Sequence, residues 1–276
     1  MNFVLSAGSL YHLPLHKAFE IGRDTGFEAM ELIINQHFQY GDRVALVRSL
    51  QRIHPVHSFH APFLDLDNWG CKIDQLLATV ELAIATGVPM ITFHPPSWQA
   101  MELKFWRWMR GIRDFQSEVG QGKVRLNIEN MPWSGPLGSN GYVYASSARM
   151  MKLLEERNLF LTFDTAHMGS SKAGFIDDFH RFYDQGRIRN IHFSDYKDGR
   201  EHLLPGHGIL PLTRFLNHLW NTDYDGGITL EFTPREFPED EGLLRQTLTE
   251  VLIYLYQETQ RECPLDGVKK LKPLPD

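Results

Sequence analysis

Only two cysteines, Cys71 and Cys263, occur among the 276 residues of the sequence. Two cysteines cannot form the disulfide framework on which small secreted domains depend. No apolar run reaches the roughly 18 residues that a membrane-spanning helix needs, and the first residues lack the basic stretch and apolar core of a signal peptide. These absences predict a cytoplasmic protein that does not cross a membrane.

The sequence also lacks an excess of positive charge. It contains 28 lysines and arginines against 34 aspartates and glutamates, which gives a net charge of −6. Proteins that bind nucleic acid without regard to its sequence usually carry a basic surface, so nucleic acid is not an expected partner. The length and the ordinary content of hydrophobic residues, 42%, fit a globular enzyme of one domain.

Six short apolar stretches each stop at a residue of a type that binds metal ions. The stretches are rich in β-branched or aromatic residues, and their end residues are His60, His94, Glu129, Asp164, His192 and Glu231. The end residues follow one another at intervals of 34, 35, 35, 28 and 39, and one strand plus one helix takes roughly 30 residues. The pattern therefore predicts one metal-ligand type at the same end of each strand–helix unit.

The residue two positions before each end residue is small and polar. These residues are Ser58, Thr92, Asn127, Thr162, Asn190 and Thr229. Residues i and i−2 share a face of a strand, so we expect a polar layer beneath the ligands that orients them through hydrogen bonds. His57 lies three residues before His60, and we expect it on the opposite face as a packing residue.

Strand and helix patterns alternate strictly along the chain. The expected strands cover residues 3–6, 29–33, 56–60, 90–94, 124–129, 159–164, 188–194 and 227–231. The expected helices cover residues 14–25, 43–53, 73–86, 101–119, 146–156, 176–184, 212–220 and 242–258. Longer polar loops are expected at 130–144 and 195–208. Eight such units predict a parallel sheet with crossover helices.

The first strand is not followed by the Gly-rich turn that an open doubly wound sheet normally shows. We therefore predict a (β/α)8 TIM barrel over residues 1–262, with the active site at the C-terminal ends of the strands. The lysines and prolines of residues 263–276 predict an extended tail.

Glu129, Asp164, His192 and Glu231 would meet at the mouth of such a barrel. Three carboxylates there would repel one another strongly without a cation. One such residue alone would be interpreted as a buried polar group, but four at matching strand ends predict a metal site. Their oxygen and nitrogen atoms suit Mn2+, Zn2+, Co2+, Mg2+ or Fe2+.

In order along the chain, six short motifs resemble those of the xylose-isomerase-like barrel superfamily, which includes sugar isomerases and epimerases and the endonuclease IV family. The motifs are HAP at His60, HPP at His94, IEN at Glu129, DTAH at Asp164 and His167, HFSD at His192 and LEF at Glu231. The resemblance covers essentially the whole chain and is closest to the sugar phosphate isomerase and epimerase branch. It implies that Glu129, Asp164, His192 and Glu231 are the shared metal ligands. His60 and His94 correspond to additional histidines, which are ligands in the endonucleases and often lie near the substrate in the isomerases.

The loop after the seventh strand distinguishes the two branches. Endonuclease IV proteins carry an Asp-x-His pair there that helps to hold a third zinc ion. His202 takes the histidine place in this chain, but Arg200 takes the aspartate place, and a guanidinium cannot bind a metal. In ketose epimerases an arginine of this loop and the histidine of the DxxH motif bind substrate oxygens. The resemblance therefore implies substrate binding by His167, Arg200 and His202, and the alternative for Arg200 is a solvated charge on the loop. Trp133, in the 130–144 loop, either packs on a sugar or anchors the loop.

These residues predict a metal-dependent isomerase or epimerase that acts on a sugar or a related hydroxy-carbonyl compound. By resemblance, a metal-stabilised enediolate would form, with Glu129 and Glu231 as base and acid on opposite faces of the reacting carbon. The expected partner is a small sugar-like molecule. The alternative is a zinc-dependent endonuclease for abasic DNA, which His60 and His94 support and Arg200 opposes. A barrel kept as a non-catalytic scaffold is disfavoured because the ligand set is intact.

Overall fold

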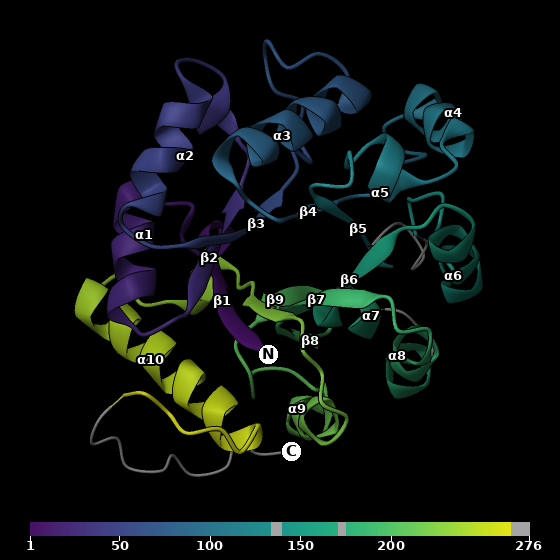
Figure 1. Cartoon of the computed structure of the whole chain (residues 1–276). Coiled ribbons are helices and arrows are strands. Elements are labelled where there is room, and N and C mark those ends of the chain that lie inside the picture. The colour runs from purple at the N-terminus through teal and green to yellow at the C-terminus, as the bar shows by residue number, and fades with distance from the viewer. Residues whose placement is uncertain (134–139, 171–174, 266–276) are drawn as a thin grey trace.

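The described residues form a closed barrel of eight parallel strands (Figure 1). This computed structural model describes residues 1–133, 140–170 and 175–265. The strands are β1 (Asn2–Ser6), β2 (Ala29–Ile33), β3 (Val56–His60), β4 (Met90–Phe93), β5 (Arg125–Glu129), β6 (Phe160–Asp164), β7 (Ile188–Phe193) and β10 (Gly227–Leu230). Neighbours pair in chain order, and β10 closes the barrel against β1. The predicted (β/α)8 TIM barrel is confirmed, and each strand lies within one residue of its expected ends.

Helices surround the barrel on the outside (Figure 1). They are α1 (Leu15–Asp24), α2 (Arg43–Gln51), α3 (Lys72–Thr86), α4 (Leu103–Gly111), α5 (Phe115–Glu118), α6 (Ser147–Glu156), α7 (Thr165–Gly169), α8 (Phe175–Asp184), α9 (Leu212–Asn221) and α10 (Glu241–Glu258). Short 3-10 turns cover Ala7–Leu10, Gln36–Phe38 and Pro234–Glu236. Local capping sets several helix starts. The side chains of Asp42, Ser146 and Asp240, for example, accept hydrogen bonds from the third backbone N–H of α2, α6 and α10.

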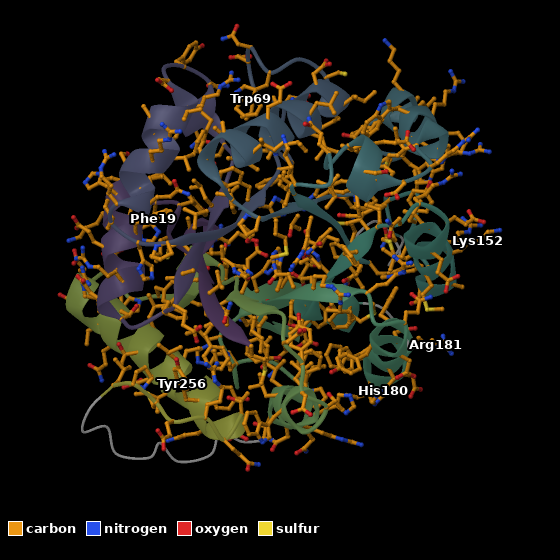
Figure 2. All side chains as sticks on the ribbon, viewed as in Figure 1. Phe19, Trp69, Lys152, His180, Arg181 and Tyr256 are labelled. Carbon is orange, nitrogen blue, oxygen red and sulfur yellow. The ribbon has the colours of Figure 1, made fainter. Side chains whose placement is uncertain are left out.

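The apolar core lies between the outer face of the barrel and the helices. Phe163 of β6, for example, contacts the rings of Phe179, Phe182 and Phe215 from α8 and α9. Charged side chains such as Lys152 of α6 and Arg181 of α8 point away from the barrel (Figure 2). Burial of these aromatic side chains holds the strands in register and fixes the positions of their C-terminal ends.

The interior of the barrel, in contrast, is polar. All six residues expected to face inward are fully buried, and several join one another across the barrel: Thr92 Oγ1 lies 2.7 Å from Thr162 Oγ1, and Thr229 donates to Asn190 Oδ1 at 2.9 Å. We expected this layer to orient the strand-end residues through hydrogen bonds, and among the described residues only Ser58 of the six reaches one of them, through Glu31. In the part of the chain that the structure describes, its hydrogen bonds run within the layer, to Met90, or from Ser58 to Glu31.

His57 does not lie on the outer face, contrary to expectation. The pairing of β2 with β3 passes from Met30–Val56 to Glu31–Ser58, so His57 is an extra residue in a β-bulge. A Cβ atom on the inward-facing Gly227 would lie 2.7 Å from Nε2 of His57. The bulge turns the imidazole into the barrel, where the missing side chain of Gly227 leaves it room.

Two other expectations for local structure are also wrong. The single helix over residues 101–119 is interrupted, because Ile112 is extended and Asp114 caps the separate helix α5. The 195–208 loop contains a two-stranded antiparallel hairpin, β8 (Asp195–Lys197) and β9 (Arg200–Leu203). Its turn is Asp198–Gly199, and both residues have positive φ angles, 50° and 79°, as a two-residue hairpin turn requires.

The final helix, α10, ends at Glu258, and Cys263 and Leu265 are partly buried against the core. Residues 266–276 of the expected tail lie outside the described residues. Among the helices of the described segments, none is both long and apolar enough to span a membrane.

Asp195, at the end of the HFSD motif, anchors the segment that follows the hairpin. Its side chain is buried and accepts hydrogen bonds from the backbone N–H groups of Tyr196, Gly206, Gly208 and Leu210 at 2.8 to 3.1 Å. Hydrogen bonds to a charged group contribute about 1.5–3 kcal/mol each and are not additive. We expect Asp195→Ala to lower the free energy of unfolding in urea by about 2–4 kcal/mol. Exposed Glu239→Ala is the control, and equal stability of the two variants would contradict the prediction.

Candidate metal centre

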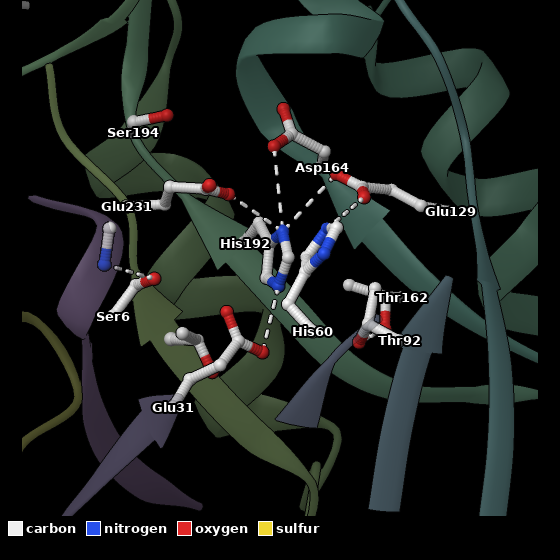
Figure 3. Close-up of polar contacts among 12 residues, drawn as sticks. Ser6, Glu31, His60, Thr92, Glu129, Thr162, Asp164, His192, Ser194 and Glu231 are labelled. Atoms are coloured by element: carbon white, nitrogen blue, oxygen red, sulfur yellow. Dashed lines mark hydrogen bonds and ion pairs between the residues drawn. The ribbon is translucent and has the colours of Figure 1, made fainter. Parts of the chain in front are cut away.

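The C-terminal ends of the strands bring Glu129, Asp164, His192 and Glu231 together (Figure 3). Glu129 and Asp164 end β5 and β6, His192 lies near the end of β7, and Glu231 directly follows β10. One ligand atom from each lies within 4.8 Å of the others. The first three side chains are buried, and that of Glu231 is 18% exposed. The four residues predicted as shared metal ligands therefore form one cluster.

His192 is surrounded by carboxylates. Its Nδ1 lies 2.8 Å from Glu231 Oε2, 3.2 Å from Glu129 Oε1 and 3.8 Å from Asp164 Oδ2. On the other side of the ring, Nε2 lies 3.2 Å from Oε2 of Glu31. Burial opposes protonation, but the charges of Glu31, Glu231 and Glu129 raise the pKa of His192 well above its ordinary value.

His60 and His94 form a second group with the same glutamate. Nε2 of each lies 3.2 Å from Oε2 of Glu129. Nδ1 of His60 lies 2.9 Å from the carbonyl oxygen of Ala61, which can only accept, so Nδ1 carries a proton. The hydrogen bond between Nε2 and Glu129 needs a second proton, and although burial opposes it, Glu129 raises the pKa of His60. Burial raises the pKa of Glu129, but the surrounding histidines outweigh it and hold this pKa well below its usual range. Glu129 therefore connects the two groups.

Asp164, His167 and His202 make a third group with ligand atoms within 4.8 Å. Asp164 Oδ1 accepts from the backbone N–H of His167 at 2.6 Å and so caps α7. Nδ1 of His167 lies 3.0 Å from the carbonyl oxygen of Asn130, and its ring lies edge-on to His202 at 5.1 Å. We expected His167 and His202 to bind substrate oxygens. The structure brings them together at the mouth in a geometry that would also allow a metal ligand role.

The donor set fits a divalent cation. Oδ2 of Asp164 is buried and has no hydrogen-bond partner among the described residues. Burial, together with the charges of Glu129 and Glu231, raises the pKa of Asp164 although His167 and His202 oppose the shift. A cation held between these carboxylates would relieve their repulsion and give Asp164 Oδ2 a partner. Three carboxylates with imidazole nitrogen form an oxygen-rich set that suits Mn2+, Mg2+, Co2+, Zn2+ or Fe2+.

The remaining two predicted substrate residues lie outside the cluster. Arg200 is exposed at the first position of β9 and makes no hydrogen bond or ion pair with any residue of the cluster in the described segments. The backbone N–H of Trp133 donates to Ser170 Oγ at 2.7 Å, and its side chain lines a cavity of about 370 Å³ that His167 and Asn130 also border. Their roles in substrate binding stay predictions.

Several residues at the mouth were missed by the interpretation of the sequence. Phe63, which is 46% exposed, stacks on His94 at a centroid distance of 5.7 Å, and Tyr142 meets the edge of the same ring at 6.3 Å. The charge of Glu201 contributes to the raised pKa of His167. All three residues lie outside the barrel strands. The two-residue period that identifies inward-facing residues of a strand therefore could not point to them. Glu31 lies inside β2 and was recognised only as part of that strand.

Comparison with known proteins agrees with this architecture. A family model described as a xylose isomerase-like TIM barrel matches residues 19–250. An uncharacterised protein of Mycobacterium leprae is 26% identical over 283 residues, covering 91% of this chain and 96% of that protein. Two solved structures share the fold. A D-tagatose 3-epimerase-like protein has a TM-score of 0.66 and 18% identity, over 94% of this chain and 98% of that chain. An AP endonuclease, family 2, from Brucella melitensis has a TM-score of 0.64 and 14% identity, over 85% and 94%.

Proposed function

The chain belongs to the family of xylose isomerase-like TIM barrels, and from this premise we propose that it is a divalent-metal-dependent isomerase or epimerase of a sugar or a related hydroxy-carbonyl compound. The observation that carries the proposal is the cluster of Glu129, Asp164, His192 and Glu231 at the barrel mouth. The likeness to a D-tagatose 3-epimerase-like protein supports a sugar as the substrate class.

The four clustered residues would hold the ion, which supplies Lewis-acid stabilisation of negative charge on substrate oxygens when it is bound. Glu129 and Glu231 are the proton-transfer groups in this proposal. One carboxylate takes the proton from the carbon between the carbonyl and the hydroxyl, which leaves an enediolate, and the other returns a proton to the product. Burial opposes ionisation, but His192 outweighs it and lowers the pKa of both carboxyls, so each can accept a proton at neutral pH. The carboxyl that returns the proton must first take one from solvent, and the carboxyl that received the substrate proton releases it to solvent.

His167 would bind a substrate oxygen. Although burial opposes it, the charges of Asp164 and Glu129 raise the pKa of His167 to about 10. In the metal-free protein the ring is therefore a cation at neutral pH and a strong hydrogen-bond donor. Phe63 and Tyr142, which flank His94, supply apolar surface for the carbon face of a sugar, as ligand pockets commonly do.

Endonuclease activity on abasic DNA is the second candidate, and one observation favours it. Three groups of possible metal ligands lie side by side, connected by Glu129 and Asp164, and the fold is shared with an AP endonuclease, family 2. Arg200 in the aspartate place and the net charge of −6 count against it.

The experiment that tests the proposal follows proton exchange in deuterated water. Purified protein is incubated with a panel of ketoses, aldoses and their phosphates, and proton NMR follows each sugar. We expect deuterium at a carbon next to the carbonyl of one sugar, together with formation of its isomer or epimer, because a carboxylate that carries the proton exchanges it with solvent. Chelation should stop both processes and added Mn2+ or Co2+ should restore them. Cleavage of an abasic oligonucleotide with no exchange into any sugar would reverse the ranking of the two candidates.

A further inference from the structure

Glu31 is a fully buried carboxylate beneath the candidate metal centre (Figure 3). It faces inward on β2, where it pairs with Ser6 of β1 and Ser58 of β3. Its Oε2 accepts a hydrogen bond from Ser58 Oγ at 2.9 Å and lies 3.2 Å from Nε2 of His192. Glu31 belongs to none of the groups of possible metal ligands among the described residues.

The two nitrogens of His192 face different surroundings. Nδ1 faces Glu129, Asp164 and Glu231, the residues that would hold the ion. Nε2 faces Glu31 on the opposite side of the ring. An ionised carboxylate can only accept hydrogen bonds, so the contact with Glu31 requires a proton on Nε2. By the same argument Glu129 and Glu231 place a second proton on Nδ1 in the metal-free protein, and a bound ion would displace that proton and not the one on Nε2. A neutral imidazole with its proton on Nε2 presents the lone pair of Nδ1 to the ion.

We propose that Glu31 is a positioning residue for the metal: it accepts the Nε2–H of His192 and so selects the tautomer and the ring orientation in which Nδ1 binds a divalent cation. Ser58 fixes the carboxylate through its own hydrogen bond. The ring of His60 stacks on the ring of His192 at a centroid distance of 5.9 Å and an interplanar angle of 27°. This stacking limits the tilt of the His192 ring, whereas Glu31 limits its rotation within the ring plane. Histidines that bind metals commonly donate their second N–H to a carboxylate in this manner.

A role in stability alone explains the arrangement less well. A buried carboxylate costs several kcal/mol unless a charge or several hydrogen bonds compensate it. Among the described residues, Glu31 has hydrogen bonds only with Ser58 and His192, and its Oε1 has no partner. A glutamate that served only to fill the barrel would be less costly as an apolar residue. The charge is compensated only if His192 carries the N–H toward it.

The test measures binding of Zn2+ alone by competition with a chromophoric chelator. We expect Glu31→Gln, which keeps the size but removes the charge, to weaken Zn2+ binding about 10–100-fold, the range measured when such outer partners of metal ligands are replaced. Ser58→Ala should give a smaller loss and serves as a milder variant if Glu31→Gln folds poorly. Thr92→Val is the matched control, because it removes a buried hydroxyl of the same layer that bonds to Thr162 and not to a ligand; its affinity should equal that of the wild type.

A second measurement needs no substitution at Glu31. In zinc-loaded wild-type protein labelled with 15N-histidine, His192 should show a protonated Nε2 and a zinc-bound Nδ1, with the signals assigned by their loss in His192→Gln. A zinc-bound Nε2, or unchanged Zn2+ affinity in folded Glu31→Gln, would overturn the inference. If Glu31 only stabilised the fold, its substitution would change the melting temperature but neither the zinc-bound nitrogen nor the Zn2+ affinity. The inference rests on the metal centre of the proposed function and not on the substrate. If the wild type binds no divalent metal, both fail; if the wild type binds Zn2+ but Glu31→Gln binds it equally well, only the inference fails.

Discussion

Glu129→Gln and Glu231→Gln should each lower kcat/KM by about 10²- to 10⁴-fold, the range that a positioned acid or base contributes, and should remove the tightly bound ion. Each substitution replaces a charged oxygen that faces His192 Nδ1 at 3.2 or 2.8 Å with a neutral amide of the same size. Each variant therefore loses both a metal ligand and a proton-transfer group, while the size of the side chain and the packing around it are kept. Metal analysis after purification without chelator, together with kinetics, provides the measurement.

The two variants should differ in a second ion. Glu129 also faces His60 and His94 through its Oε2, whereas Glu231 belongs only to the group with Asp164 and His192. Any ion at His60 and His94 should thus survive in Glu231→Gln and be lost in Glu129→Gln. Glu28→Gln is the control, because Glu28 pairs with Arg261 and belongs to none of the described ligand groups. If either active-site variant kept its metal and turned over substrate at the wild-type rate, the substituted glutamate would be neither a metal ligand nor a proton-transfer group.

The fold could be predicted because its signal is local and repeated. Six of the eight strands are short apolar runs that stop at a carboxylate or an imidazole, and a parallel barrel places all such ends at one mouth. Glu129, Asp164 and His192 therefore meet although they are far apart in the chain. The same argument placed Thr92 and Thr162 inside the barrel, where they are hydrogen-bonded to each other.

What depends on register could not be predicted in this way. One extra residue in β3 reverses the face of His57, and sequence periodicity cannot locate a bulge because a slip of one residue exchanges the two faces of a strand. The role of Glu31 depends on which side of the His192 ring it meets, and this is a contact between strands β2 and β7, 161 residues apart. The sequence did contain a signal for the hairpin at Asp195–Leu203, because Asp198–Gly199 is a pair typical of two-residue hairpin turns. The segment was predicted as a loop because only its polarity was considered.

The three groups of possible ligands share too few negative charges for three ions. Glu129 belongs to two groups and Asp164 to two, so the ligands carry three carboxylate charges in total. With Glu31 beneath them, four carboxylates balance two divalent cations. A third ion at His167 and His202 would add two uncompensated positive charges, and two like charges 4 Å apart repel by about 4 kcal/mol at a surface-like dielectric. Arg200, on the same hairpin as His202, adds a further cation.

We therefore expect one tightly bound ion at Glu129, Asp164, His192 and Glu231. At most one further ion binds, at His60 and His94, and none binds at His167 and His202.

Arg200 is then free to bind a substrate oxygen. Arg200→Ala should lower kcat/KM about 10- to 100-fold, since a charged hydrogen bond contributes about 1.5–3 kcal/mol, and should lose no metal. Lys197→Ala is the matched control, because Lys197 pairs with Arg200 across the hairpin; its kinetics should stay near wild type. Metal analysis of the wild type and both variants decides the count. Three ions per chain, with cleavage of abasic DNA that survives in Arg200→Ala, would assign the protein to the endonuclease branch, because only a zinc-cluster nuclease needs the third ion.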